Sequence, residues 1–263
     1  MADEGIRTFL PGQADENAPG GIGTLSEKTV HAFLKNLYMP DPSMQEIPLG
    51  KYVADIFDGN TVTEIQTRNF AVLRRKLDSF LPLCPVRVVY PVVCSLSVVW
   101  TDPETGAASS PRKSPKHGKP TDALHELWQI RDYLTNPELT VEIVLLNAEE
   151  YRIRNGRGPE KKKGGTKADR VPTELVEILR FERPEDYRIF LPDTLPDKFS
   201  APEYGKAAGL RQRQAYSAVH VLESLGLIGR APKDDVPKGG KKRTATLYRV
   251  LPAGQKKQKE KKA

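Results

Sequence analysis

The chain has 263 residues, 38% of them hydrophobic, and a formal net charge of +7, which suits two small globular domains. No run of roughly 18 apolar residues occurs, so the sequence predicts no membrane span. Residues 1–22 are acidic and rich in Gly and Pro, which predicts disorder rather than a secretory signal. Cys84 and Cys94 lie in apolar runs and are expected to be buried thiols of a cytoplasmic protein.

Elements of a first domain follow one another over residues 23–154. Helical spacing of Val30, Phe33, Leu34 and Leu37 predicts a helix over 24–38. A short apolar run near residue 47 precedes the further predicted elements, which are strands 52–57 and 61–67, a basic helix 69–81, strands 86–93 and 95–100, an exposed basic loop 101–120, helix 121–134 and strand 140–146.

The composition then changes to a basic linker over residues 155–170, which contains the run KKKGGTK. A second domain is predicted over 171–251, with a strand near 171–181 and short helices at 184–192, 200–209 and 211–226. Two strands, LIGRA and ATLYRVL, flank a basic loop, and the tail 252–263 is Lys-rich and expected to be disordered. The basic clusters suggest a polyanion such as nucleic acid, and the alternative is that they only stay solvated.

This second domain resembles a winged helix-turn-helix, on the residues FSAPEYGKAAGLRQRQAYSAVHVLESLGLIGR followed by KKRTATLYRV. The resemblance implies that the second helix of the pair enters the major groove of DNA. Its first residues and the basic wing are the expected contacts, with Ser217 also facing outward toward phosphate. The predicted nucleic-acid-binding residues are Arg211, Gln212, Arg213, Gln214, Lys241, Lys242 and Arg243. The alternative for this domain is protein contact or dimerisation, so a homodimer stays open.

The hairpin YVADIFDGNTVTEIQT raises a different question, because it places carboxylates inside an otherwise apolar pair of strands. Under a two-residue turn at Gly59-Asn60, or a four-residue loop over 58–61, Asp55 lies opposite Glu64, and Gln66 shares their face. A turn at Asp58-Gly59 would shift the pairing by two residues but keep the face, whereas a three-residue loop would break the arrangement. Opposed carboxylates repel one another unless the face is wet or a cation lies between them. A hard cation such as Mg²⁺ or Mn²⁺ would suit these oxygens. The alternative is a polar hairpin that merely faces solvent.

The order of these predicted elements resembles that of the PD-(D/E)xK nuclease-like superfamily, in the form of CoiA-like competence nucleases. The order is a helix, a strand with Asp, a strand with Glu-x-Gln, a helix and a strand. The match covers roughly residues 24–93, and the run YVADI…EIQT…LRRKL is also similar to an uncharacterised bacterial family that joins such a domain to a winged helix. The resemblance implies an α/β fold with a restriction-endonuclease-like αβββαβ core. It implies Asp55, Glu64 and Glu27 as metal ligands, and Gln66 in place of the usual Lys that orients the attacking water. Glu27 is also explained by a capping box with Thr24.

The sequence therefore predicts a nucleic-acid-binding protein that hydrolyses phosphodiester bonds with Mg²⁺ or Mn²⁺. DNA is the expected partner, and the expected location is the cytoplasm. The alternative is a non-catalytic DNA-binding regulator or accessory factor whose nuclease-like domain is inactive. A third reading is a scaffold in a larger nucleic-acid complex, with the Lys-rich segments as tethers.

Overall fold

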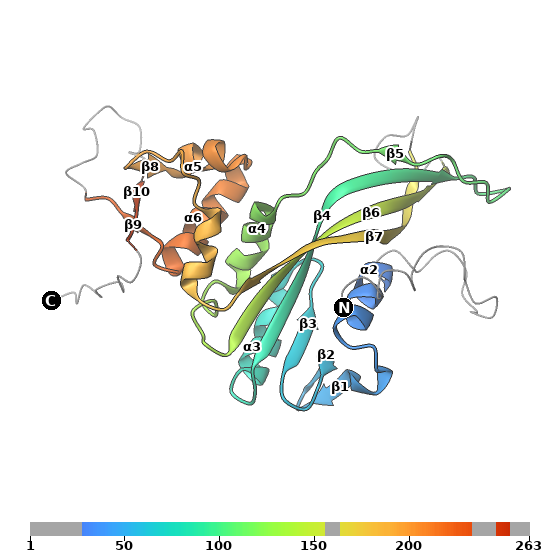
Figure 1. The fold of residues 1–263 in the computed structure, drawn as a ribbon, viewed down its shortest axis with the longest axis horizontal. Coiled ribbons are helices and arrows are strands. Elements are labelled where there is room, and N and C mark those ends of the chain that lie inside the picture. The colour runs from blue at the N-terminus through green and yellow to red at the C-terminus, as the bar shows by residue number, and fades with distance from the viewer. Residues whose placement is uncertain (1–27, 156–163, 233–245, 253–263) are drawn as a thin grey trace. The chain divides into compact units, whose positions relative to one another are not determined.

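The computed structural model describes residues 28–155, 164–232 and 246–252 (Figure 1). Its helices are α2 (Lys28–Tyr38), α3 (Leu73–Phe80), α4 (Ala123–Leu127), α5 (Ala201–Ala208) and α6 (Gln212–Ser224). Its short 3-10 helices are η1 (Pro42–Met44), η2 (Phe70–Val72), η3 (Pro120–Asp122), η4 (Trp128–Ile130) and η5 (Pro184–Phe190). Its strands are β1 (Gln45–Leu49), β2 (Tyr52–Phe57), β3 (Val62–Ile65), β4 (Val86–Thr101), β5 (Arg112–Lys113), β6 (Leu139–Ile153), β7 (Thr166–Phe181), β8 (Phe199–Ser200), β9 (Ile228–Arg230) and β10 (Leu247–Val250).

The chain is a mixed α/β protein that divides into two compact units. The first unit is made of Met1–Thr67, Arg87–Lys119 and Glu142–Leu179, and the second contains the three remaining segments. The units are therefore interleaved along the chain, unlike the consecutive domains 23–154 and 171–251 that composition suggested. Composition marks a linker by its polar residues, but it carries no information on which distant segments pair.

The larger sheet has the strand order β1-β2-β3-β4-β6-β7, with β5 paired to β4. Strands β1, β2 and β3 form an antiparallel meander, and β5 is antiparallel to β4. The contacts of Gln66 with Val89 and of Thr63 with Arg87 show that β3 and β4 run in the same direction. A parallel pair needs a crossover connection, and α3 lies on the segment that supplies it. The sheet is therefore mixed, and its long strands β4, β6 and β7 lie side by side (Figure 1).

Helix α2 covers part of this sheet with the apolar face that its spacing predicted. Val30, Phe33 and Leu34 are buried, and they share a core cluster with Ile56 of β2, Ile65 of β3, Val89 of β4, and Val144 and Leu146 of β6. Burying this stripe fixes which side of α2 faces the strands, because helical residues three and four apart share one face. The residues beside the stripe are consequently held at the edge of the sheet, where β1 and β2 run.

A buried ion pair lies in the same sheet. Glu142 of β6 is only 4% exposed, and its carboxylate accepts a hydrogen bond from the Tyr38 hydroxyl. Arg87 of β4 places its Nε 3.4 Å from a Glu142 oxygen, and its guanidinium lies 5.5 Å from the centre of the Tyr38 ring. Because a buried carboxylate needs a compensating charge and hydrogen bonds, we interpret this cluster as structural.

The second unit contains the consecutive helices α5 and α6, which pack against each other, and a small sheet with the order β8-β10-β9. Ser200 and Glu203 form the capping box that the sequence predicted at the start of α5. Gly209 ends α5 with φ +66°, a left-handed conformation in which a residue without Cβ is favoured. Tyr204 is fully buried and donates its hydroxyl hydrogen to the Phe190 carbonyl at 2.9 Å, which ties α5 to η5.

Several predicted elements are longer in the structure. The strands expected at 86–93 and 95–100 are one strand, β4, and the exposed loop 101–120 folds back on it through the pairs Ser97–Lys113 and Val98–Arg112. Part of the predicted linker is strand, because β7 begins at Thr166. Cys84 and Cys94 form no disulfide, and no helix within the described ranges is long and apolar enough to cross a membrane.

Candidate active site

The β2–β3 hairpin has the register that the turn residues predicted. Ile56 pairs with Thr63 and Phe57 with Val62, and the Asp58 amide donates to the Thr61 carbonyl at 3.4 Å. Asp58 also closes the turn with its side chain, which accepts hydrogen bonds from the amides of Asn60 and Thr61. One step further along this register, Asp55 lies opposite Glu64.

At that step, side chains replace the backbone ladder between the two strands. The Ile65 amide donates to Asp55 Oδ2 at 2.7 Å, and the Asp55 amide approaches Glu64 Oε1 at 3.4 Å. Each acidic side chain thus contacts the backbone of the opposite strand, at the point where the backbone pairing of β2 with β3 ends. The predicted pair is brought together in the structure.

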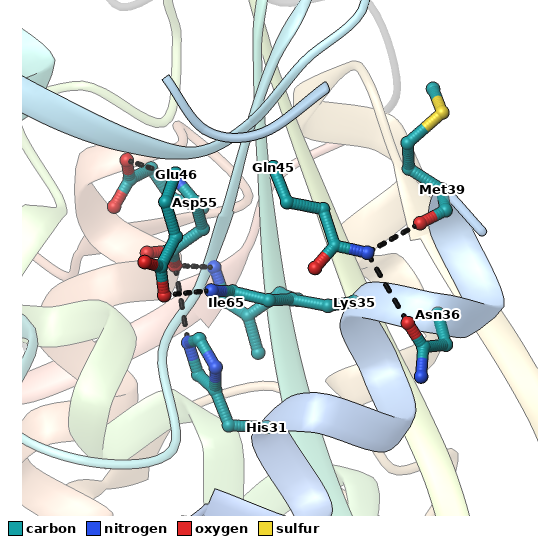
Figure 2. Close-up of polar contacts among 9 residues, drawn as sticks. His31, Lys35, Asn36, Met39, Gln45, Glu46, Asp55 and Ile65 are labelled. Carbon is teal, nitrogen blue, oxygen red and sulfur yellow. Dashed lines mark hydrogen bonds and ion pairs between the residues drawn. The ribbon is translucent and has the colours of Figure 1, made fainter. Parts of the chain in front are cut away.

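Helix α2 adds two side chains at the same place. His31 Nε2 lies 3.3 Å from Asp55 Oδ2, and Lys35 Nζ donates to Glu46 Oε1 at 2.7 Å. Figure 2 shows both side chains reaching from the helix toward the strands that carry Asp55 and Glu46. The Lys35 ammonium lowers the pKa of Glu46 by hydrogen bonding and by direct charge attraction. The first helix therefore supplies an imidazole and a cation to the carboxylate region.

Strand β1 is distorted where it passes this site. Glu46 has φ +53°, an uncommon backbone conformation for a residue with a side chain. It falls between the pairs Gln45–Ile56 and Ile47–Ala54, and so lies across from Asp55. The Gln45 amide group holds this segment to α2 through Asn36 Oδ1 and the Met39 carbonyl (Figure 2). Backbone strain of this kind gathers at functional sites, and here it occurs in the strand next to Asp55.

Burial separates the members of the site. Glu64 is 1% exposed, whereas the side chains of Asp55 and His31 are 19% and 30% exposed. Gln66 is partly buried, and its backbone amide donates to the Val89 carbonyl at 2.9 Å, which joins β3 to β4. Solvent thus reaches Asp55 and His31, while Glu64 lies beneath the surface.

Sequence reasoning missed His31, because it treated the four histidines as isolated from one another. A usable signal was present, since residues 27, 31 and 35 recur every four positions and so share one face of a helix. Glu27, the third predicted metal ligand, lies outside the described residues.

The side chains of this site offer a hard cation two neighbouring carboxylates rather than a complete set of ligands. Among the residues that the structure describes, no three His, Cys, Asp or Glu side chains form a group that could hold a metal ion. Two neighbouring carboxylates are nevertheless a known protein contribution to a Mg²⁺ site, since this ion keeps several waters and binds substrate phosphates. Asp55 and Glu64 are the residues that would hold it.

The predicted nucleic-acid contacts on α6 divide into exposed and covered residues. Arg211, Gln212 and Arg213 are exposed at the beginning of the helix. Gln214 is partly buried and donates from Nε2 to Asp122 Oδ1 at 3.3 Å. The predicted wing residues Lys241, Lys242 and Arg243 lie outside the described part of the chain.

The outward orientation expected for Ser217 is wrong. Ser217 is 8% exposed, and its hydroxyl lies 3.0 Å from His125 Nδ1 of α4. Helix α4 packs against α6 within the second unit, so this face of α6 is occupied by the chain itself. The sequence could not show this, because α4 is about 90 residues away along the chain.

Comparison with known proteins places the chain in a family. Residues 28–182 match the family model described as Domain of unknown function (DUF8091). The match covers more than half of the chain, so the chain belongs to this family. It is also similar to an "Uncharacterized protein" of Treponema pallidum (strain Nichols), with 29% identity over 235 residues that make up 89% of each chain. No solved structure matches the chain.

Proposed function

We propose that this member of the DUF8091 family is a metal-dependent phosphodiesterase that acts on nucleic acid. The observation that carries the proposal is the Asp55–Glu64 pair, held across two neighbouring strands where the backbone ladder stops. Two carboxylates facing one another are unfavourable unless a cation compensates them. Asp55 and Glu64 each contact the opposite strand, and these contacts hold both carboxylates in position for such a cation.

The order of elements supports the same proposal. Helix α2, the meander β1-β2-β3, helix α3 and strand β4 follow one another as in the αβββαβ core of PD-(D/E)xK nucleases. Asp55 lies on the second strand, Glu64 lies on the third, and Gln66 follows directly after the end of the third strand. A likeness of fold alone establishes no activity, so the proposal depends on the residues of the site.

Each side chain of the site has a proposed role. Asp55 and Glu64 would hold the divalent ion, which would supply polarisation of a phosphodiester and activation of a water molecule. The Gln66 amide orients that water through hydrogen bonds, which an amide both donates and accepts. His31, whose Nε2 lies 3.3 Å from Asp55 Oδ2, orients that carboxylate. Lys35 and Glu46 hold α2 and β1 together around them.

The second unit is proposed to bind DNA as a winged helix. The elements η5, β8, α5, α6, β9 and β10, with the sheet order β8-β10-β9, support this assignment. Arg211, Gln212 and Arg213 are exposed and suited to base edges or phosphates. Gln214 is omitted from the proposed contacts, because Asp122 already accepts its hydrogen bond.

One observation favours a second candidate, a non-catalytic nucleic-acid-binding protein. Glu64 is 1% exposed, and its Oε1 lies 3.4 Å from the Asp55 amide. A buried carboxylate that contacts the backbone in this way can have a purely structural role in the hairpin. In that case the basic surfaces would bind nucleic acid, and the nuclease-like unit would act as a scaffold.

Glu64→Gln separates the two candidates, because it keeps the shape of the side chain and removes its charge. We expect the wild type to cleave single-stranded or duplex oligonucleotides with Mg²⁺ or Mn²⁺, and Glu64→Gln to lose about 100-fold or more in rate, as for removal of a key electrostatic group. The melting temperature of the wild type should rise with the divalent ion, because an ion that binds only the native state stabilises it. Glu64→Gln should show a smaller rise.

The matched control is Glu177→Gln, which removes an exposed carboxylate of β7 in the same unit. This control should keep both the cleavage rate and the metal-induced melting shift. Equal melting shifts in the wild type and Glu64→Gln, together with no cleavage by the wild type of any DNA or RNA substrate, would reject the catalytic proposal and favour the non-catalytic one.

A further inference from the structure

The first unit contains a second polar site, separate from the Asp55 region. A groove of about 810 Å³ runs over β4, β5, β6 and the beginning of β7. Its cationic side chains are Arg112, Lys113, Lys116, Arg152, Lys167 and Arg170, and among its lining residues the one carboxylate is Glu150. We call this feature the basic groove. It brings together four chain segments that the sequence keeps apart.

Glu150 organises one wall of the basic groove. It is 3% exposed, and its two oxygens accept hydrogen bonds from different arginines, Arg152 at 2.8 Å and Arg170 at 2.7 Å. Burial opposes ionisation of Glu150, but the hydrogen bonds and charges of Arg170 and Arg152 outweigh it and lower its pKa. The carboxylate is therefore ionised at neutral pH, and it holds both guanidinium groups in fixed positions while neutralising only one charge.

Trp100 also lines the basic groove, and its ring lies close to two arginine side chains. The guanidinium carbons of Arg152 and Arg154 lie 5.7 and 5.8 Å from the centre of its ring, within the range of cation–π attraction. Gly165 leaves room for this ring, because a Cβ there would lie 2.4 Å from Trp100 Cζ3 and 2.5 Å from the Ile153 carbonyl oxygen. The positions of the arginine side chains in this part of the groove therefore depend on Trp100, Gly165 and Glu150.

The groove also contains cationic side chains from β5 and the residues after it that take no part in the ion pairs of the described residues. Arg112, Lys113 and Lys116 are exposed, and within the described residues none of them forms an ion pair. Together with Arg152, Lys167 and Arg170, they give the groove six cations against one carboxylate. Like charges gathered in a concave site focus a strong positive potential and attract an anionic ligand.

We propose that the basic groove binds the phosphate backbone of single-stranded nucleic acid. The cations come from β5 and the residues after it, and from β6 and β7, so they can contact successive phosphates of one strand, as in grooves that follow a single strand. The width of a duplex would leave much of its backbone outside a pocket of this volume. None of the lining residues belongs to the Asp55–Glu64 site, and the nature of the ligand as nucleic acid rests on the proposed function.

The test is a binding measurement on the full-length protein in EDTA, so that cleavage plays no part. The groove variant is Arg112→Ala/Lys116→Ala, which removes two exposed cations. The matched control is Lys51→Ala/Arg75→Ala, which removes the same two residue types at exposed positions outside the groove. The probe is a fluorescent 20-nucleotide oligothymidylate, followed by anisotropy at several salt concentrations, with a 20-base-pair duplex measured in parallel.

Loss of two phosphate contacts should reduce the slope of log K against log salt by about 1.4, at ~0.7 per contact on a single strand, and weaken binding about 25-fold at 0.1 M salt. The control should keep the affinity and slope of the wild type, and circular dichroism should show the same fold in all three proteins. An unchanged affinity of the groove variant would overturn the proposal, and so would a larger loss on the duplex than on the single strand. If the wild type cleaves no substrate but the groove variant still loses affinity for the single strand, the catalytic proposal fails and the groove assignment stays in place, so the two proposals fail separately.

Discussion

Replacing Asp55 should reveal how much of its role is structural, because two substitutions remove different parts of it. Asp55→Ala removes the acceptor of the Ile65 amide, and Ile65 is 3% exposed, so that amide would lose its partner in a buried place. A hydrogen bond to a charged group contributes about 1.5–3 kcal/mol, and an unsatisfied buried donor costs a similar amount. The Asp55 side chain is 19% exposed, and its contact with His31 is partly in water. We therefore expect a loss of about 2 kcal/mol in unfolding free energy.

Asp55→Asn keeps an oxygen that can accept from Ile65, and it removes the charge that repels Glu64. It should cost at most about 1 kcal/mol, because a neutral hydrogen bond is roughly half as strong as a charge-assisted one. Both variants should lose metal-dependent cleavage, since neither offers a carboxylate at this position. Catalysis and stability are therefore expected to respond differently to the same pair of substitutions.

Urea unfolding followed by tryptophan fluorescence and circular dichroism measures the difference. A loss of 2 kcal/mol should lower the midpoint by about 1 M if the slope is ~2 kcal/mol/M. Asp58→Ala is the control, because Asp58 accepts from two backbone amides of the same hairpin at an exposed turn, where water can replace it. Equal losses for Asp55→Ala and Asp55→Asn, or for Asp55→Ala and Asp58→Ala, would refute the reasoning from the buried amide.

Two further predictions concern the basic groove and the second unit. Glu150→Gln should lower the unfolding free energy at pH 7 by about 2 kcal/mol, less than for a fully buried ion pair because Arg152 and Arg170 are partly exposed. The folded-state pKa of Glu150 is lowered, so its contribution is fully present above the unfolded pKa and is lost as the pH falls through the folded value. The midpoints of wild type and variant should accordingly converge in acid, and a difference that stays constant from pH 7 to below pH 4 would contradict the assignment. Arg211→Ala/Arg213→Ala should weaken duplex binding and reduce its salt slope by about 1.8 if both residues contact phosphates, at ~0.9 per contact, whereas an unchanged slope in the same titration would assign α6 to protein contact.

The sequence by itself determined features that depend on a few neighbouring residues. The turn at Asp58 set the β2–β3 register, and with it the position of Asp55 opposite Glu64. Ser200 and Glu203 determined where α5 begins, and Gly209 determined where it ends. In each case, the deciding hydrogen bonds or backbone angles join residues within a few positions of one another, so the pattern is complete in a short stretch of sequence.

Only the tertiary structure decided which distant segments meet. It joined the two predicted strands after residue 85 into one, placed His31 against Asp55, covered Ser217 with α4, and assembled the basic groove from four segments. These contacts depend on which faces of the helices and strands are buried together. That choice is made by the packing of the whole core and by contacts between residues as far as 140 positions apart, and no local pattern encodes it.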